Sequence, residues 1–413
     1  MTLSESIHYR AGSLHCDDVP IRQIVAHVGT PVYIYSLRRV LANLARIRRA
    51  FASLNPHIHY SAKANANITI LTALVNARAG IDAVSAGEIH RALLAGAEPN
   101  DIVFAGVGKT PNEIGYALEH NVGWINVENE GELVFINEMA QSLNFPPVRI
   151  ALRLNPDIGA DTHPYIATGH GGAKFGLPVE TIRSILARQG QLKGVSIEGI
   201  HVHIGSQLHN TAATQQAVQK ALDLIAPYER IRTVNIGGGL PVAYHDGESI
   251  PAWEDFAAAL TPLLRGYSVI LEPGRSVIAD AGILVASVIY VKEQAGKRFL
   301  ITDASMSELI RPALYQARHQ IIPVTQQSGG ELPYEIVGPV CETTDVLGHD
   351  IRLPATAPGE LLAVLTTGAY GMVMASNYNQ RVRPPEVIVL ENGEQWTIAR
   401  RRETWEDLVR LEQ

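Results

Sequence analysis

The stretch HIHYSAKAN, residues 57–65, begins with an apolar run that ends at a lysine, Lys63. A lysine at the inner end of a buried strand is costly unless its ammonium group has a partner or a covalent use. A helical pattern follows this run, and the order strand, loop, helix then repeats along the chain. The strand candidates are His57–Ala62, Ile81–Val84, Ile102–Ala105, Gly123–Val127, Val148–Leu154, Ile197–His203, Arg232–Ile236 and Ser268–Leu271.

Helix starts are well marked between these strands. Residues 85–88, SAGE, predict a capping box, and Gly96 is placed to end that helix. Residues 110–113, TPNE, add a proline at the first helical position to the same device. Asn129 with Glu132 is a weaker third case.

Eight apolar strands, each followed by a helical pattern, favour a (β/α)8 TIM barrel over its rival, an open doubly wound sheet. The polar motifs support the barrel, because barrel sites collect at the carboxyl ends of the strands. The residues that lie on or just after these strands are Lys63, Asp82, Asn155, His203, the glycines 237–239 and Glu272.

A second, mainly β domain is predicted after Arg275, where short β-branched runs alternate with Gly, Pro and Asn turns. We expect a barrel over 36–277, and a β domain built from 1–35 and 278–413. Within it, residues 31–35 could add a strand and Glu308–His319 is the clearest helix. The expected strands are Gly282–Val291, Arg298–Thr302, Tyr334–Val337, Leu361–Thr366, Val387–Glu391 and Trp396–Arg400.

The composition excludes several classes of protein. The chain has 413 residues, of which 46% are apolar and 18% are charged. Its net charge is −7, so non-specific binding to nucleic acid is not expected. No apolar stretch approaches membrane-spanning length, and residues 1–18 lack the order of a secretion signal. With only Cys16 and Cys341 and no metal spacing between them, we expect a cytoplasmic protein, although one disulfide stays possible.

The glycines 237–239 follow the seventh strand, and Gly274-Arg275 follows the eighth. Loops after these two strands commonly hold a phosphate in barrels, because glycine lets backbone N–H groups approach an anion. An isolated triple glycine is more often a tight turn. The shared position with an arginine and a lysine favours the phosphate site.

Three side chains would suit an aldehyde cofactor. Lys63 could hold the aldehyde covalently, and Glu272 could keep a pyridine nitrogen protonated. His203 could lie against the ring. The structural alternatives are a lysine that snorkels to the barrel mouth, an ion pair of Glu272 with Arg275 or Arg153, and a core histidine. His201 and His203 also resemble a metal pair, but no third ligand has suitable spacing, so we expect no metal.

The chain resembles the diaminopimelate decarboxylases, within the fold-type III pyridoxal phosphate decarboxylases that include ornithine decarboxylase. The resemblance covers nearly the whole chain, and nine motifs in order carry it. They are residues 60–65, 82–88, 174–176, 201–207, 237–240, 272–275, 309–315, 338–342 and 368–371.

The resemblance implies a role for each candidate residue. Lys63 would hold pyridoxal 5′-phosphate, His203 would stack on its ring and Glu272 would pair with the ring nitrogen. Further cofactor contacts would come from Asp82, Ser206, Gly237, Gly238, Gly239, Gly274, Arg275 and Tyr370. The distal carboxylate of the substrate would be received by Arg275, Arg311 and Tyr315, with Tyr370 close by.

The resemblance also implies that Glu342 receives the distal ammonium group and that Cys341 supplies the proton after carbon dioxide leaves. In this family both residues reach the site of the neighbouring subunit, so a homodimer with shared sites is implied.

The implied reaction is decarboxylation of meso-2,6-diaminopimelate to L-lysine, the last step of lysine biosynthesis. Two arginines suit a distal carboxylate through forked hydrogen bonds, whereas an amine-only substrate would leave them without a partner. Decarboxylation of arginine, ornithine or carboxynorspermidine is the nearest alternative. An amino-acid racemase, which places arginine on the ring nitrogen, and a non-catalytic relative are the others.

Overall fold

The structure is a computed structural model that describes residues 3–159 and 168–412. The chain divides into two compact units. The barrel unit comprises residues 44–241 and 250–276, and the β unit comprises residues 1–43, 242–249 and 277–413. Among the described residues, no helix is both long and apolar enough to cross a bilayer.

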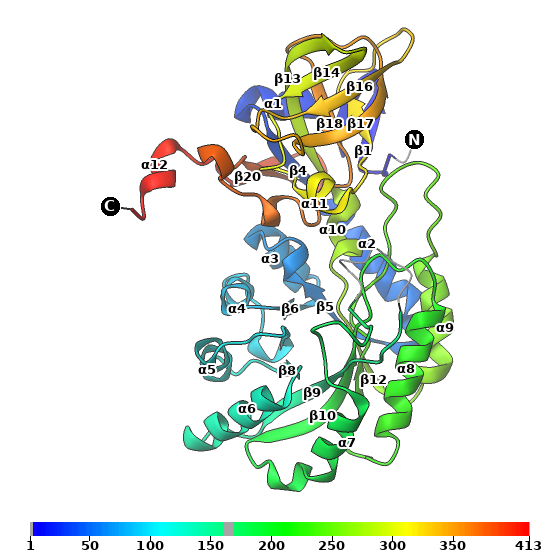
Figure 1. Cartoon of the computed structure of the whole chain (residues 1–413), viewed down its shortest axis with the longest axis vertical. Helices are drawn as coiled ribbons and strands as arrows, with labels where there is room; N and C mark the ends of the chain where they lie inside the picture. The colour runs from blue at the N-terminus through cyan, green and yellow to red at the C-terminus, as the bar shows by residue number, and fades with distance from the viewer. Residues whose placement is uncertain (1–2, 160–167, 413) are drawn as a thin grey trace. The chain divides into compact units, whose positions relative to one another are not determined.

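The barrel unit contains a closed barrel of parallel strands, as the sequence predicts (Figure 1). The strand that precedes Lys63 pairs with the next strand along the chain and with the last strand of the barrel, which closes the sheet. All eight predicted strands are present. Their bounds are β5 His57–Ser61, β6 Gly80–Ala83, β7 Ile102–Phe104, β8 Trp124–Val127, β9 Val148–Leu154, β10 Val195–Val202, β11 Thr233–Asn235 and β12 Ser268–Leu271.

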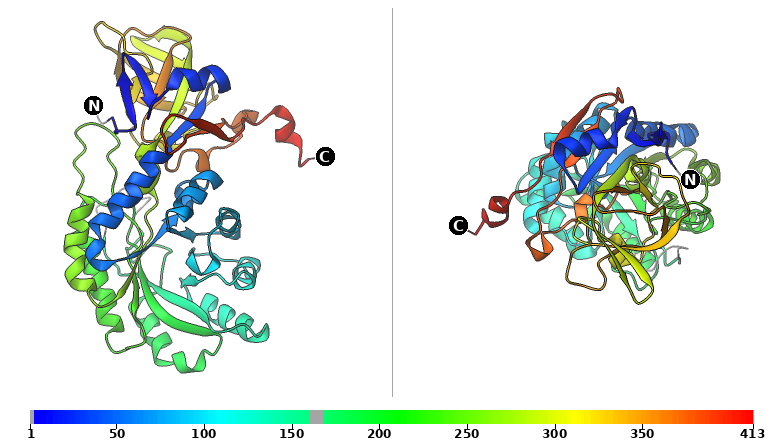
Figure 2. Two further views of the ribbon diagram at one scale, coloured as in Figure 1. Left: turned by 180° about the vertical axis from the view of Figure 1, so that it is seen from behind. Right: turned by 90° about the horizontal axis from the view of Figure 1, so that it is seen from above.

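Helices lie outside these strands (Figures 1 and 2). The capping box at Thr110 and Glu113 is confirmed, with Pro111 at the first helical position. Each of the helices α3 to α10 follows its strand, whereas α2 precedes the first one, so the strand-to-helix loops lie at one end of the barrel. The helices are α2 Leu37–Ala50, α3 Ile68–Asn76, α4 Ala86–Leu94, α5 Pro111–Glu119, α6 Glu130–Ser142, α7 Val179–Ala187, α8 Ala212–Ile225, α9 Trp253–Leu264 and α10 Arg275–Ile278.

One predicted cap differs in detail. The Ser85 side chain accepts a hydrogen bond from the Glu88 N–H, as expected. The Glu88 carboxylate, however, accepts from the backbone N–H of Val84 at 2.8 Å rather than from that of Ser85. The Glu88 side chain therefore caps the N–H one residue before the N-cap, and it links the end of β6 to the start of α4.

The β unit is built around a nine-stranded sheet and a small three-stranded sheet. The predicted strand near residues 31–35 is confirmed as β4, which pairs antiparallel with β13 and parallel with β19. A core of fully buried aliphatic side chains, including Ile34, Val285 and Val387, holds these strands together. The strands are β1 Ile7–Arg10, β2 Ser13–Cys16, β3 Val19–Pro20, β4 Val32–Ser36, β13 Gly282–Gln294, β14 Lys297–Thr302, β15 Ile321–Pro323, β16 Leu332–Val337, β17 Val346–Leu353, β18 Leu361–Val364, β19 Glu386–Val389 and β20 Trp396–Arg400.

The helix expected over Glu308–His319 is wrong in length. Only α11, Arg311–Tyr315, is helical, because Gln316 takes a left-handed conformation with φ of 52° that ends the helix. The remaining helices of this unit are α1, Ile21–Val28, and α12, Trp405–Val409.

Candidate active site

Lys63 lies at the carboxyl end of β5, in the short 3-10 turn Ala62–Ala64. Its ammonium Nζ is 3.3 Å from Oδ2 of Asp82, and its side chain is 40% exposed whereas that of Asp82 is fully buried. Oδ2 of Asp82 also accepts a 2.6 Å hydrogen bond from the Ser61 hydroxyl. The lysine is therefore partnered and reachable from solvent, which combines the two conditions that a covalently used lysine needs.

The pKa of Asp82 is raised, first by burial and then by the negative charge of Glu272, with Lys63 acting in the opposite direction. Its second oxygen, Oδ1, is buried without a hydrogen-bond partner among the described residues. A buried oxygen in that state is uncommon in folded proteins and points to a further group at the site.

Glu272, directly after β12, is held as a carboxylate inside the barrel. Oε1 accepts hydrogen bonds from the side-chain amides of Asn126 at 3.1 Å and Asn235 at 2.5 Å. Oε2 lies 3.4 Å from Nε2 of His201. Burial raises the pKa of Glu272, but His201, Lys63 and the Asn235 amide together outweigh it, so the pKa lies well below its ordinary value.

His203 follows the end of β10 and is a neutral imidazole. Burial lowers its pKa well below the ordinary value, and the charges of Arg153 and Lys63 lower it further. Its Nδ1 accepts a 3.3 Å hydrogen bond from the Gly238 N–H, so the proton of the ring resides on Nε2. A Cβ at Gly237 would lie 2.6 Å from this Nδ1, so only glycine lets the loop pass so close to the ring.

The loops after β10, β11 and β12 meet at a basic group. The Nε of Arg275, which is buried, donates a 3.1 Å hydrogen bond to the hydroxyl of Ser206. A Cβ at Gly238 would lie 2.5 Å from the carbonyl oxygen of Glu272, and one at Gly274 would lie 3.0 Å from Cβ of Ser61. The glycines thus serve the close contact of three loops, and the arginine and serine give the same place the chemistry of an anion site.

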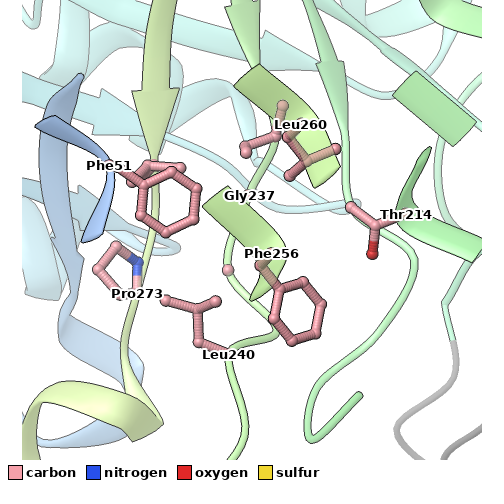
Figure 3. Close-up of a pocket in the computed structure, with 10 residues that line it drawn as sticks. Phe51, Thr214, Gly237, Leu240, Phe256, Leu260 and Pro273 are labelled. Carbon is pink, nitrogen blue, oxygen red and sulfur yellow. The ribbon is translucent and has the colours of Figure 1, made fainter. Parts of the chain in front are cut away.

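Gly237 and Gly238 also line a small cavity with Phe51, Phe256 and Leu260 (Figure 3). Its lining holds no charged side chain, and Thr214 supplies its one hydroxyl. This cavity does not suit a charged cofactor, so the candidate site is the polar cluster around Lys63 and not this pocket.

Arg153 forms an ion pair with Glu128 and not with Glu272. Its Nη1 is 2.7 Å from Oε1 of Glu128, and both side chains are buried. Oε2 of Glu128 accepts from the backbone N–H of Gly176 at 3.3 Å, and the Arg153 guanidinium lies 4.9 Å from the ring centre of Phe175. The structural alternative in which Glu272 pairs with Arg153 is therefore wrong, and Arg153 instead anchors the 174–176 motif.

The β unit carries Arg311 and Tyr315, both on helix α11. Arg311 is buried and Tyr315 is half-buried. The guanidinium of Arg311 lies 4.3 Å from the ring centre of Tyr244, and its Nη1 is 2.8 Å from Nε2 of His319.

Cys341 and Glu342 lie in an exposed segment of the β unit between β16 and β17. The Glu342 carboxylate accepts hydrogen bonds from the hydroxyls of Tyr378 and Thr344. The hydrogen bond to Glu342 raises the pKa of the Tyr378 phenol. Cys341 is a free thiol, as is the buried Cys16.

Tyr370 adopts a left-handed backbone conformation, with φ of 56°. This is unusual for a bulky side chain and is found most often where function requires it. A Cβ at Gly368 would lie 2.0 Å from the carbonyl oxygen of Ile278, so the residues around Tyr370 leave little freedom to relax.

Several residues of the site are missing from the sequence-based prediction. Asn126 and Asn235 hold Glu272 with buried amides; Asn126 lies within β8 and Asn235 is the last residue of β11. A polar residue inside such a strand is a usable signal, because a buried amide needs a partner. In the β unit, the neighbours of Arg311 and Glu342, namely His319, Tyr244 and Tyr378, carry no comparable signal.

Comparisons with known proteins agree with this geometry. Residues 37–279 match the family described as "Pyridoxal-dependent decarboxylase, pyridoxal binding domain". The diaminopimelate decarboxylase of Aquifex aeolicus is 40% identical over 409 residues, which cover 98% of this chain and 96% of that protein. The enzyme of the same name from Vibrio cholerae is 42% identical over 412 residues, 97% of each chain.

A solved structure is similar over the same extent. The crystal structure of Helicobacter pylori diaminopimelate decarboxylase complexed with L-lysine matches with a TM-score of 0.89 and 38% identity, covering 95% of this chain and 98% of that one. Family match, full-length relatives and barrel with β domain all agree, so the chain belongs to the diaminopimelate decarboxylase family of pyridoxal-dependent, fold-type III decarboxylases.

Proposed function

We propose that the protein decarboxylates meso-2,6-diaminopimelate to L-lysine and carbon dioxide, with pyridoxal 5′-phosphate as its cofactor. The observation that carries this proposal is an accessible Lys63 beside Asp82 in a barrel whose Glu272 is held as a carboxylate. Full-length relatives named diaminopimelate decarboxylase, and the lysine bound in the Helicobacter pylori structure, support it.

The residues present fit this cofactor. Lys63 would hold its aldehyde, and the carboxylate of Glu272 would hold a proton on the ring nitrogen. The neutral ring of His203 suits contact with a flat heterocycle, and Arg275 with Ser206 suits the phosphate. The buried oxygen Oδ1 of Asp82, which lacks a partner among the described residues, fits a polar group placed beside Lys63. The remaining cofactor contacts that we propose are Gly237, Gly238, Gly239, Gly274 and Tyr370.

When bound, pyridoxal phosphate supplies an aldehyde that takes up the substrate's amino group and a ring that withdraws electrons from the carbon losing its carboxylate. The chain's own groups control charge and protons around that carbon. Glu272 stays ionised because His201, Lys63 and the Asn235 amide stabilise the carboxylate more than burial destabilises it. In the low-dielectric barrel this preorganised charge would be the largest contribution to rate.

We propose that Cys341 returns the proton. The bond between the α-carbon and its carboxylate breaks and carbon dioxide leaves. The thiol of Cys341 then gives its proton to that carbon, and the thiolate regains a proton from solvent. At the far end of the substrate, Arg311, Tyr315 and Arg275 would bind the carboxylate and Glu342 the ammonium group, because a forked guanidinium matches a carboxylate in geometry and charge.

The test is release of carbon dioxide from separated substrates. The protein, supplied with pyridoxal phosphate, is expected to act on meso-diaminopimelate at least about 100-fold faster than on lysine, ornithine or arginine, because only diaminopimelate satisfies the distal arginines. The L,L stereoisomer serves as the matched control, since it carries the same groups with the reacting centre inverted. Equal or faster release from ornithine, arginine or carboxynorspermidine would reject the substrate assignment.

We further propose a homodimer in which Cys341 and Glu342 serve the site of the neighbouring subunit. The exposure of both side chains supports this arrangement. Lys63→Ala and Cys341→Ala should each be nearly inactive alone. Random reassociation of equal amounts should restore about a quarter of the wild-type activity, because half of the dimers gain one intact site of two.

Light scattering of the same mixture provides the control for assembly. A dimeric mixture with no recovered activity would mean that each site takes both residues from a single chain.

A further inference from the structure

Arg311 in the β unit is held by a neutral histidine. Its Nη1 is 2.8 Å from Nε2 of His319, and the other ring nitrogen, Nδ1, is 2.8 Å from the carbonyl oxygen of Leu365. A guanidinium can only donate and a carbonyl can only accept. These two contacts therefore require a neutral imidazole whose proton is on Nδ1 and whose Nε2 accepts from the arginine.

Tyr244 completes this cluster from a distant part of the chain. Its ring centre is 4.3 Å from the Arg311 guanidinium and 5.2 Å from the His319 ring, which it meets nearly at right angles. Tyr244 belongs to the segment 242–249, which is part of the β unit. The backbone N–H of Gln320 donates to the carbonyl oxygen of Tyr244 at 3.3 Å, which ties that segment to the residue after His319.

All three side chains are at least nine-tenths buried, with exposed fractions of 7% for Arg311, 3% for His319 and 7% for Tyr244. Burial restricts their rotation, so the contacts determine how the guanidinium points. A planar guanidinium held on one edge by an acceptor and on one face by an aromatic ring has little freedom left.

We propose that His319 and Tyr244 are positioning residues that orient Arg311 for the distal carboxylate of the substrate. This inference rests on the proposed role of Arg311 as a carboxylate ligand. Neither residue is proposed to touch the substrate. Together they determine the specificity for an amino-acid group over a bare amine at the far end.

The choice of a histidine follows from electrostatics. A carboxylate in the place of His319 would align the guanidinium equally well, but it would also neutralise the charge that attracts the substrate. A neutral imidazole aligns Arg311 by accepting one of its N–H groups on Nε2, and it leaves the positive charge of Arg311 intact. The aromatic ring likewise favours the cation without adding a negative charge.

The experiment compares two ligands that differ only in the distal carboxylate. L-lysine retains the carboxylate, and cadaverine, its decarboxylated form, lacks it. Inhibition constants of both are measured on the protein with pyridoxal phosphate bound, for the wild type, His319→Leu and His319→Gln. The glutamine oxygen can still accept from Arg311, and His349→Leu, at an exposed position of the same unit, is the matched control.

In His319→Leu, the affinity for L-lysine should fall about tenfold and the KM for meso-diaminopimelate should rise similarly, while kcat and cadaverine binding change less than about twofold. His319→Gln should restore most of the loss, and His349→Leu should match the wild type. Unfolding is followed by circular dichroism. If His319→Leu does not fold, Tyr244→Leu is judged by the same criterion.

The two proposals fail differently. A wild type that binds L-lysine no more tightly than cadaverine would show that the distal carboxylate is not recognised, and it would reject the role proposed for Arg311. A wild type that prefers L-lysine, together with folded variants at His319 and Tyr244 that keep the whole preference, would overturn the positioning role alone.

Discussion

Replacement of Lys63 by alanine is expected to reduce carbon dioxide release from meso-diaminopimelate by at least about 10⁴-fold, the scale seen when a covalently acting residue is removed. The variant should also lose the visible absorbance of the bound cofactor, because no other amine is paired with Asp82 in the described site. Activity is measured as carbon dioxide released, and cofactor binding is measured by absorption spectroscopy of the dialysed protein.

Lys193→Ala is the matched control. Lys193 is exposed and precedes β10, at the opposite end of its strand from His203, so its loss should leave both readouts unchanged. A Lys63→Ala variant that retains full turnover would refute the assignment of this lysine.

Glu272→Gln should lower kcat by about 10²–10³-fold, the range found when one preorganised charge is removed from a reacting centre. Glutamine has the same shape but is neutral, so the ring nitrogen would no longer be held protonated. The amide oxygen can still accept from Asn126 and Asn235, which should preserve the fold and keep KM within a few-fold. Steady-state kinetics separate the two parameters.

Glu198→Gln, on strand β10, offers a comparison at a half-exposed site where the carboxylate pairs with Arg149. It should leave kcat unchanged. If Glu272→Gln were as active as the wild type, the charge at this position would have no part in the reaction.

The barrel could be predicted from the sequence because each of its strands is a short apolar run bounded by a turn and a helix cap. The same regularity predicted the carboxyl-end residues Lys63, Asp82 and Glu272, which the structure brings around one another. Local patterns suffice there, since parallel strands place their carboxyl ends at one edge.

The β unit was harder to predict for a physical reason. The pattern over Glu308–His319 looks helical, yet Gln316 leaves the helix and His319 turns inward to Arg311. The partner ring of Tyr244 comes from a segment that follows a barrel strand. Neither contact produces a periodic pattern in the sequence, because the spacing along the chain of the residues that it joins follows no rule.

The route of the chain has a consequence for protein engineering. The polypeptide leaves one unit for the other after residues 43, 241, 249 and 276. A fragment cut at 44 and 276 would still contain the eight residues 242–249, without the β unit to which they belong. A barrel exchanged between homologues at those two cuts would therefore bring along residues 242–249 of the donor's β unit. A chimaera should instead take residues 242–249 from the same homologue as the rest of the β unit.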